Sequence, residues 1–201
     1  IGMPYVDVPN PFEGEYGAES YAQFFEREFL DSISAFGIEM EFRNQAEMYR
    51  SGKYTQWILL ALQKRFEIYD LLAQHRTQAP TEEERNNYYP VSIYCSECGR
   101  DTTRILSLSE DGAVARYRCD CGHEGSFDFR TDHNCKLNWK IDWPMRWMYE
   151  GVDFEPGGKD HASPHGSYDT SKDISRKIFG FEPPIFQGYE FIGIKGTTGK
   201  M

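Results

Sequence analysis

Long apolar runs are missing from the sequence. The longest spans the six residues from Trp57 to Leu62, whereas a membrane-spanning helix needs about 20. This absence excludes a transmembrane helix and predicts a soluble chain with no membrane partner. The sequence also has no internal repeat and no low-complexity segment, and its hydrophobic content of 39% is that of a folded, slightly polar protein.

Positive charge is scarce as well. The 22 Lys and Arg residues face 32 Asp and Glu residues, which gives a formal net charge of −10. This balance excludes a uniformly basic surface of the kind that coats nucleic acid. The acidity is local, because residues 1–50 hold ten acidic and three basic side chains, a balance of −7, and leave −3 for the other 151 residues. A basic patch elsewhere on the chain can therefore still bind a polyanion.

Cysteine is sparse, and its few copies are grouped. Four of the five cysteines form two close pairs, Cys95 with Cys98 and Cys119 with Cys121. This grouping is unlike a secreted disulfide framework, and no signal peptide precedes it, so we expect a reducing cytoplasm. Because a glycine follows each pair and predicted strands separate the pairs, the spacing is typical of a zinc ribbon.

Zinc takes four soft ligands in a tetrahedron, so four thiolates would form a structural site with no open position for chemistry. The second pair departs from the usual spacing, because one residue instead of two separates its cysteines. Two other ligand sets therefore stay open, one with Cys121 and His123 and one completed by Cys135. A set of reduced cysteines without metal is a further alternative.

The first part of the chain has mainly helical periodicity. Apolar residues three or four apart predict helices over 18–36 and 54–75, and Asn44 is suited to cap a short helix that ends at Gly52. Alternation of apolar and acidic residues predicts a strand over 38–42. The expected order is helix, strand, helix, helix.

For the rest of the chain, the sequence predicts short strands followed by an α/β unit. A small β insert is predicted from strands at 88–94, 102–108, 113–118 and 126–129, with a hairpin turn at 111–112. Beyond it we expect a strand at 137–141, a short helix at 144–149, extended chain at 152–154, a Gly-Gly turn at 157–158, a helix at about 168–179 and a strand at 189–194. Strand, glycine turn, helix and strand form the unit of a parallel nucleotide-binding sheet.

The glycine turn has residues that suit a nucleotide. Gly157 and Gly158 would let the backbone approach a nucleotide closely, and the carboxylate of Asp160 can accept hydrogen bonds from both ribose hydroxyls. His161 follows directly. On this spacing alone, a tight turn with a capping Asp is the alternative.

The run from Asp142 to Asp169, together with the ending Gly199-Lys200-Met201, resembles the class I lysyl-tRNA synthetases. In that family the glycine turn precedes a KMSKS-type loop, whose first two residues Lys200 and Met201 match. The resemblance implies an internal fragment, which runs from after the HIGH signature to the start of the KMSKS-type loop. It is specific from Leu137 to Met201 and vague over the first 90 residues.

The resemblance implies an α/β fold: part of a Rossmann-type catalytic domain with an inserted small β zinc-ribbon connective domain. Residues 1–87 would hold the remainder of one Rossmann half and the helical part of the connective region. Residues 88–135 would be the zinc-ribbon-like insert, and residues 136–201 the second Rossmann half up to the KMSKS-type loop.

The function implied is that of a lysine–tRNA ligase. Such an enzyme activates lysine with ATP, which Mg²⁺ accompanies, to form lysyl-adenylate, and it then transfers lysine to the 2′-hydroxyl of the terminal adenosine of tRNA(Lys). By resemblance we expect a cytoplasmic, monomeric protein with ATP, lysine and tRNA(Lys) as partners and with structural zinc. Without the HIGH residues, we expect the 201 residues alone not to aminoacylate tRNA.

Individual roles follow from the same resemblance. Gly157, Gly158 and Asp160 would hold the ATP ribose, with His161 beside the nucleotide. Lys200, on the KMSKS-type loop, would face the phosphates as a catalytic residue.

The lysine pocket would include Trp143, His165 and Tyr189, because an ammonium on an aliphatic stem favours aromatic walls. Each has an ordinary alternative as a core residue, a helix cap or a strand residue.

The insert also contains arginines that could bind the phosphates of an acceptor end: Arg100, Arg104, Arg116, Arg118 and Arg130. Surface arginines are common on any ribbon, so an ordinary solvated surface is the alternative. Two other functions stay open for the whole chain. One is a non-catalytic zinc-ribbon RNA-binding module, and the other is a class I synthetase for another amino acid, such as glutamate or arginine.

Overall fold

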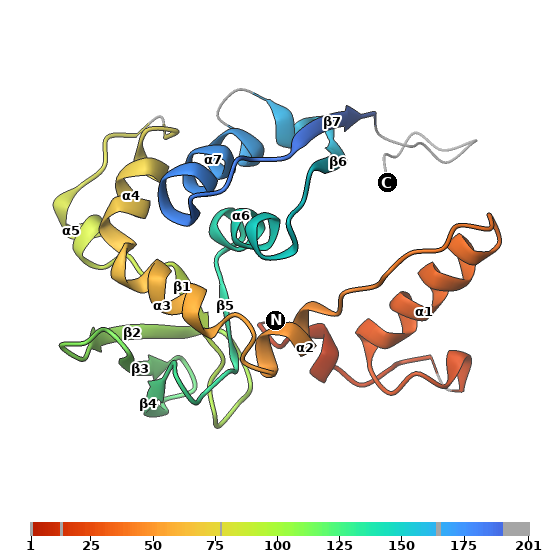
Figure 1. Cartoon of the computed structure of the whole chain (residues 1–201). Coiled ribbons are helices and arrows are strands. Elements are labelled where there is room, and N and C mark those ends of the chain that lie inside the picture. The colour runs from red at the N-terminus through yellow and green to blue at the C-terminus, as the bar shows by residue number, and fades with distance from the viewer. Residues whose placement is uncertain (1, 13, 77, 164–165, 191–201) are drawn as a thin grey trace. The chain divides into compact units, whose positions relative to one another are not determined.

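The computed structural model describes residues 2–12, 14–76, 78–163 and 166–190 (Figure 1). The chain forms two compact units. The first comprises Ile1–Gln56 with Ser92–Cys135, and the second comprises Trp57–Val91 with Lys136–Met201. No helix in the described part is long and apolar enough to cross a bilayer. The elements are of mixed α/β type.

The first unit begins with two 3₁₀ turns, η1 (Tyr5–Asp7) and η2 (Glu15–Gly17), and the helix α1 (Tyr21–Ser34). Ser20 caps α1, because its hydroxyl accepts a hydrogen bond from the backbone N–H of Gln23 at 3.2 Å. Phe24 is buried against the ring of Phe12, with ring centroids 4.4 Å apart. These observations confirm the helix predicted over 18–36, with the narrower bounds Tyr21–Ser34.

The strand predicted over 38–42 is wrong. Within the described ranges these residues pair with no strand, and the side chains of Ile38, Met40 and Phe42 are exposed. A period of two indicates a strand only where a neighbouring strand supplies hydrogen bonds to the backbone, and none lies beside this segment in the described chain.

The next helices follow the sequence pattern, with one break. Asn44 caps α2 (Gln45–Arg50), because its side-chain oxygen accepts from the backbone N–H of Glu47 at 3.0 Å. The single helix predicted over 54–75 is divided into α3 (Thr55–Gln63) and α4 (Arg65–Ala73). Lys64 separates them, because its φ of −94° and ψ of 13° leave the helical region. Periodicity continued across this break, so the pattern alone did not reveal it.

A three-stranded antiparallel sheet forms the rest of the first unit. Its order is β2 (Thr103–Leu108), β3 (Val114–Cys119) and β4 (Glu124–Asp128). The predicted hairpin is confirmed, with Gly112 at a φ of 72°. Along β3, Ala115, Tyr117 and Cys119 are buried while Arg116 and Arg118 are exposed, so one face of the sheet is covered and the other is open.

Two short strands, β1 (Val91–Ile93) and β5 (Cys135–Leu137), form a separate two-stranded sheet. The second unit holds α3 from Trp57 onward and α4. It also holds α5 (Glu82–Asn86), α6 (Trp139–Glu150), β6 (Phe154–Gly158), the 3₁₀ turn η3 (Lys159–Ala162), α7 (Ser167–Ile174), a π-helical turn η4 (Ser175–Phe179) and β7 (Ile185–Tyr189). Strands β6 and β7 are parallel neighbours joined through α7, as Figure 1 shows. The predicted parallel strand–helix–strand unit is confirmed.

Three boundaries in this unit differ from the prediction. The strand expected at 137–141 ends at Leu137, because α6 begins at Trp139 and includes the segment expected as a short helix. The Gly-Gly turn is wrong: Gly157 and Gly158 end β6, where they pair with Gly188 and Tyr189. The last strand lies at Ile185–Tyr189 instead of 189–194, and residues 191–194 lie outside the described residues.

Candidate metal centre and ligand site

The four paired cysteines lie together at the ends of the ribbon hairpins. Their sulfur atoms all lie within 4.8 Å of one another. The Sγ atoms of Cys95 and Cys121 are 3.8 Å apart, and those of Cys98 and Cys119 are 3.6 Å apart. All four are free thiols. The structure therefore brings together the four residues that the spacing predicted.

The sulfur positions fit a tetrahedral metal. A zinc ion about 2.3 Å from each of four sulfurs would separate them by about 3.8 Å, close to the two distances above. The turns that bring the sulfurs together depend on Gly99 and Gly122, whose φ values of 70° and 94° are unfavourable for other residues. The donor set of four thiolates suits zinc.

The two other ligand sets are not supported. His123 points its Nε2 at the hydroxyl of Ser96, 3.1 Å away, and this hydroxyl also lies 3.1 Å from the Tyr117 hydroxyl. Cys135 is buried, and the cluster found among the described residues does not include it. Burial raises the pKa of the Cys135 thiol to about 12, which favours an inert structural role.

The thiols of the cluster differ in acidity. The backbone N–H of Cys121 and the Thr102 hydroxyl hydrogen-bond the sulfur of Cys119 and lower its pKa to about 6. A hydrogen bond from the backbone N–H of His123 acts to lower the pKa of Cys121. The hydrogen bond between Cys121 and Cys119, together with desolvation, outweighs that effect and raises the pKa of Cys121 to about 12. A metal needs thiolates, so binding would displace the protons still held at neutral pH.

A second group of predicted residues lies where β6 ends. Gly157 is buried, and a Cβ atom there would come within 2.6 Å of the Phe186 ring, so this position requires glycine for packing. At Gly158 a Cβ atom would lie 2.5 Å from the Asp160 carboxylate. The absence of both side chains lets Phe186 of β7 and Asp160 of η3 lie directly over the backbone of β6.

Asp160 and His161 follow on η3 and are accessible. Their side chains are 55% and 38% exposed, and the Nε2 of His161 lies 4.0 Å from the nearer carboxylate oxygen of Asp160. Both lie just beyond the carboxyl end of β6, which is where open parallel sheets bind ligands. An exposed carboxylate beside a side-chain-free backbone can accept hydrogen bonds from the hydroxyls of a sugar.

Trp143 lies in a row of indoles on α6. Its ring is stacked on that of Trp139, with centroids 5.0 Å apart and planes 20° apart, and lies 5.0 Å from the ring of Trp147. The imidazole of His161 meets it edge-on at 5.6 Å. Trp143 is only 6% exposed, so it packs as a core residue in the described chain. Its role in binding lysine stays a prediction.

Trp139 is a residue that the sequence analysis missed. It is 47% exposed, and its ring lies 6.4 Å from that of His161. The signal was present, because residues 139, 143 and 147 recur every four positions, which places them on one face of a helix.

The other predicted pocket residues are placed only in part. Tyr189 ends β7, pairs in register with Gly158 and is 56% exposed. It therefore lies near the residues predicted to hold the ribose. His165 and Lys200 lie outside the described residues, as does Met201.

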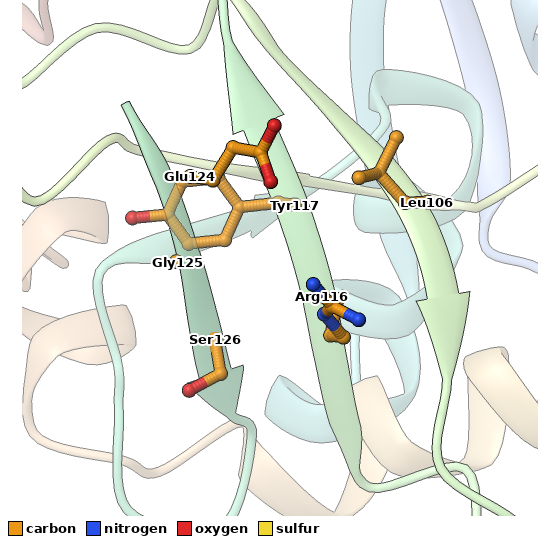
Figure 2. Close-up of a pocket in the computed structure, with 6 residues that line it drawn as sticks. All are labelled: Leu106, Arg116, Tyr117, Glu124, Gly125 and Ser126. Carbon is orange, nitrogen blue, oxygen red and sulfur yellow. The ribbon is translucent and has the colours of Figure 1, made fainter. Parts of the chain in front are cut away.

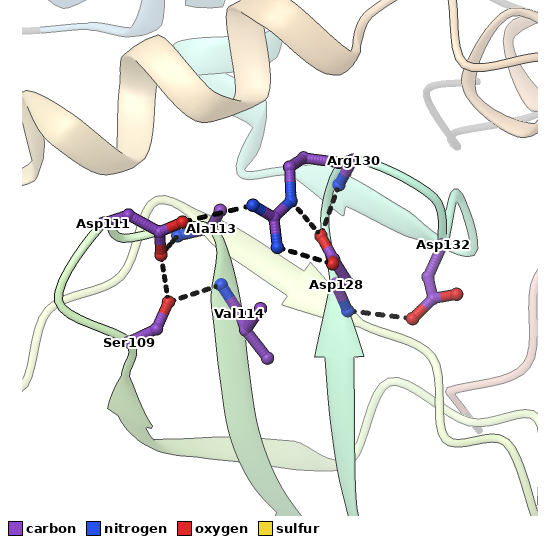
Figure 3. A network of polar contacts seen from close by, with 7 residues as sticks. All are labelled: Ser109, Asp111, Ala113, Val114, Asp128, Arg130 and Asp132. Atoms are coloured by element: carbon purple, nitrogen blue, oxygen red, sulfur yellow. Dashed lines mark hydrogen bonds and ion pairs between the residues drawn. The ribbon is translucent and has the colours of Figure 1, made fainter.

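The arginines of the ribbon fall into two groups. Arg130 is held by two carboxylates: its Nε and Nη2 donate to Asp128 at 2.8 and 2.7 Å, and its Nη1 donates to Asp111 at 3.2 Å (Figure 3). Hydrogen bonds from Arg130 lower the pKa of Asp128, and a hydrogen bond from Ser109 is the largest cause that lowers the pKa of Asp111.

Arg118 is likewise paired, because its Nε donates to Glu124 at 2.7 Å. Arg100, Arg104 and Arg116 are exposed and form no ion pair within the described residues. The guanidinium groups of Arg118 and Arg130 are therefore bound to carboxylates, whereas the other three could bind a ligand.

Comparison with known proteins identifies one family. The family described as tRNA synthetases class I (K) matches residues 1–201. The lysine–tRNA ligase of Pyrococcus horikoshii is 42% identical over 201 residues, which cover 100% of this chain and 37% of that protein. The lysine–tRNA ligase of Borreliella burgdorferi is 46% identical over 182 residues, 90% of this chain and 34% of that protein. A third, from Treponema pallidum, is 39% identical over 201 residues. The chain spans about a third of the length of these relatives.

Proposed function

Because the chain belongs to the class I lysyl-tRNA synthetases, we propose that the full-length protein carrying it is a lysine–tRNA ligase. The observation that carries this proposal is the family match, which extends over residues 1–201. The protein would join lysine to ATP, release pyrophosphate, and pass lysine from the adenylate to the terminal adenosine of tRNA(Lys). A synthetase for glutamate or arginine, and a non-catalytic RNA-binding ribbon, are less consistent with this match.

We further propose that the end of β6 binds the ribose of ATP. In this proposal the backbone at Gly157 and Gly158 lies against the sugar, and the Asp160 carboxylate accepts hydrogen bonds from its hydroxyls. His161 lies beside the nucleotide. The exposure of Asp160 and His161, and their place at the carboxyl end of a parallel strand, support these roles.

The reaction needs no covalent enzyme intermediate. The carboxylate of lysine attacks the α-phosphate of ATP, so the enzyme must align the two groups and stabilise the charge that develops on the phosphate. In the proposal Lys200 provides positive charge at the phosphates of ATP, and Mg²⁺ binds together with ATP. Trp143, His165 and Tyr189 line the lysine pocket, where aromatic walls suit the aliphatic stem and the ammonium.

The four-cysteine cluster would hold zinc as a structural ion. Its thiolate donors and sulfur spacing support zinc, and four protein ligands leave no position for a substrate. Reduced thiols also suit the cytoplasm, where we place the enzyme. We keep the division into residues 1–87, 88–135 and 136–201 as a proposal, with the ribbon as an insert between two Rossmann halves.

The test of this function is aminoacylation by the full-length protein. We expect charging of tRNA(Lys) with lysine and not with glutamate or arginine. Asp160→Asn should raise the KM for ATP about tenfold or more, because one charged hydrogen-bond partner of the ribose is weakened. The exposed Asp153→Asn removes the same charge just before β6 and should leave this KM unchanged.

The outcomes separate the alternatives. Failure of the wild-type protein to charge tRNA, with RNA binding retained, would favour the non-catalytic module. Charging with another amino acid would overturn the assignment of lysine. Equal effects of the two Asp substitutions would overturn the role of Asp160 in binding ATP.

A further inference from the structure

The open face of the ribbon sheet presents two available arginines. The register pairs Arg104 of β2 with Arg118 of β3, and Ser107 with Arg116. Residues alternate between faces, so Arg116 and Arg118 are exposed while their neighbours Ala115 and Tyr117 are buried. Arg104 and Arg116 are then diagonal neighbours across the two strands, roughly 7–8 Å apart at their backbones.

An exposed leucine lies on β2, two residues after Arg104. The register of β2 shifts between Ile105 and Ser107, and this bulge leaves Leu106 on the open face with 51% of its surface exposed. Figure 2 shows Arg116 on the central strand, flanked by Leu106 on β2 and Ser126 on β4. Leu106, Arg116 and Ser126 line a pocket of about 280 Å³ together with Tyr117, Glu124 and Gly125.

The charge on this face is not neutralised locally. Glu124, the acidic residue of the pocket, already accepts hydrogen bonds from Arg118. Arg104 and Arg116 have no carboxylate partner among the described residues, whereas Arg130, in the turn after β4, has two. The face therefore keeps two positive charges in a chain whose net charge is −10.

These features fit a ligand with regularly spaced phosphates. A guanidinium group offers planar, paired donors that match phosphate oxygens. Two such groups on adjacent strands could each contact a phosphate of the same RNA strand. The exposed Leu106 adds apolar surface for a sugar, and phosphate and sugar contacts are those that position a nucleic acid. The acidic segment of residues 1–50, with a charge balance of −7, would repel an RNA, whereas the open face of the ribbon sheet offers it two guanidinium groups without a carboxylate partner in the described chain.

We propose that Arg104, Leu106 and Arg116, which we name the ribbon arginine face, bind the phosphate backbone of the tRNA substrate. This inference rests on the proposed function, because it takes the enzyme's own tRNA as the polyanion. Of the five arginines that the sequence offered, Arg118 and Arg130 are occupied by carboxylates and Arg100 lies outside the strands, which leaves Arg104 and Arg116 on the open face.

The experiment compares arginine variants of the full-length enzyme in direct tRNA binding. Arg104→Ala and Arg116→Ala should each weaken tRNA binding about fivefold at 0.15 M salt, and the double variant about 25-fold, because each lost contact releases about one counterion fewer. The slope of log Kd against log salt should become shallower by about one for each arginine. Fluorescence anisotropy with labelled tRNA(Lys) at four salt concentrations measures both.

Arg130→Ala is the matched control. It removes one positive charge from the turn that follows β4, from a guanidinium group that two carboxylates already hold, so tRNA affinity and salt slope should stay at the wild-type values. Arg104→Lys with Arg116→Lys keeps both charges, so it should retain the salt slope while losing part of the affinity. Thermal unfolding of each variant checks that the sheet is folded.

The proposal is overturned if the double variant binds tRNA with wild-type affinity and slope. It is also overturned if Arg130→Ala causes an equal loss, because general charge would then explain the binding. Lower thermal stability with unchanged tRNA affinity would show instead that another part of the protein covers this face. If the wild-type enzyme charges tRNA(Lys) and these outcomes occur, only the inference fails; if it charges no tRNA, the proposed function fails.

Discussion

Trp143 has neighbours that link the hydrophobic core to the proposed nucleotide site. On one side it stacks on Trp139 and packs against Trp147, and on the other its ring meets the imidazole of His161. The indole of Trp147 is fixed by a hydrogen bond from its Nε1 to Glu155 at 2.9 Å. A change at Trp143 therefore affects both packing and the side chain that we place beside ATP, and an experiment must separate these effects.

Substitution of Trp143 tests the proposal that it binds lysine. In the full-length protein, Trp143→Ala should raise the KM for lysine about tenfold or more, because a wall of the proposed pocket is lost, and should change the KM for ATP much less. Trp143→Phe keeps an aromatic ring and should recover part of the lysine affinity. Steady-state aminoacylation with each substrate varied in turn measures the split.

Trp147→Ala provides the control for packing. Both Ala variants should lower the free energy of unfolding, by about 3–5 kcal/mol for a buried tryptophan, but only Trp143→Ala should affect lysine selectively. Equal losses for lysine and ATP in the Trp143 variant would show that it acts through the core alone.

At the scale of elements, α6 shows how a proline is accommodated inside a helix. Pro144 has no N–H to donate to the carbonyl oxygen of Lys140, four residues earlier. The hydroxyl of Ser171, on α7, donates to this carbonyl at 3.4 Å and is fully buried. The helix can therefore start at Trp139, although the sequence led us to expect it only from Pro144 onward.

A double-mutant cycle tests this arrangement. Ser171→Ala should destabilise the protein by about 1 kcal/mol, because the part-buried carbonyl of Lys140 loses its hydrogen-bond partner. In a Pro144→Ala background the new N–H can bond the same carbonyl, so the cost of Ser171→Ala should fall markedly. Denaturant unfolding of the four proteins gives the coupling energy. Equal costs in both backgrounds would show that Ser171 acts by packing alone.

Local sequence patterns predicted most helices and strands, but they did not predict features that depend on contacts between residues far apart in the chain. The helix α1, the capped α2 and the ribbon hairpin followed from periodicity and turn residues, which depend on neighbours in sequence. The prediction of a strand at 38–42 is wrong because a strand needs a partner strand. The glycine pair at 157–158 is typical of a turn in sequence, but Gly157 accommodates the ring of Phe186, which lies 29 residues later in the chain. The four paired cysteines lie together in the structure, because two hairpins place both pairs by local geometry; their role as metal ligands stays a prediction.

At the scale of the molecule, the ribbon sheet of the first unit has only a small hydrophobic core. The ribbon sheet buries a few side chains, among them Ala115, Tyr117, Phe127 and Phe129. A core this small supplies limited stabilisation, and small domains of this kind often need metals. The four-cysteine cluster joins the chain at residues 95–98 to the chain at 119–121, so a metal there would hold the ends of the hairpins together.

We expect zinc removal to unfold the ribbon locally. Treating the full-length enzyme with a strong chelator should remove zinc and increase amide hydrogen exchange within residues 92–135, because the tie between the hairpins is lost. Exchange within β6, α7 and β7 should change little, since those elements belong to the other unit. Hydrogen exchange followed by mass spectrometry, with metal content measured in parallel, resolves the two regions.

Three cysteine and histidine variants identify the ligands. Cys119→Ser should lose one equivalent of zinc relative to wild type, because it removes a member of the sulfur cluster. Cys135→Ser and His123→Ala should keep the wild-type zinc content, since Cys135 lies outside the cluster and His123 is bonded to Ser96. Loss of zinc from either of these two, or its retention in Cys119→Ser, would contradict the assigned set and require one of the alternative ligands.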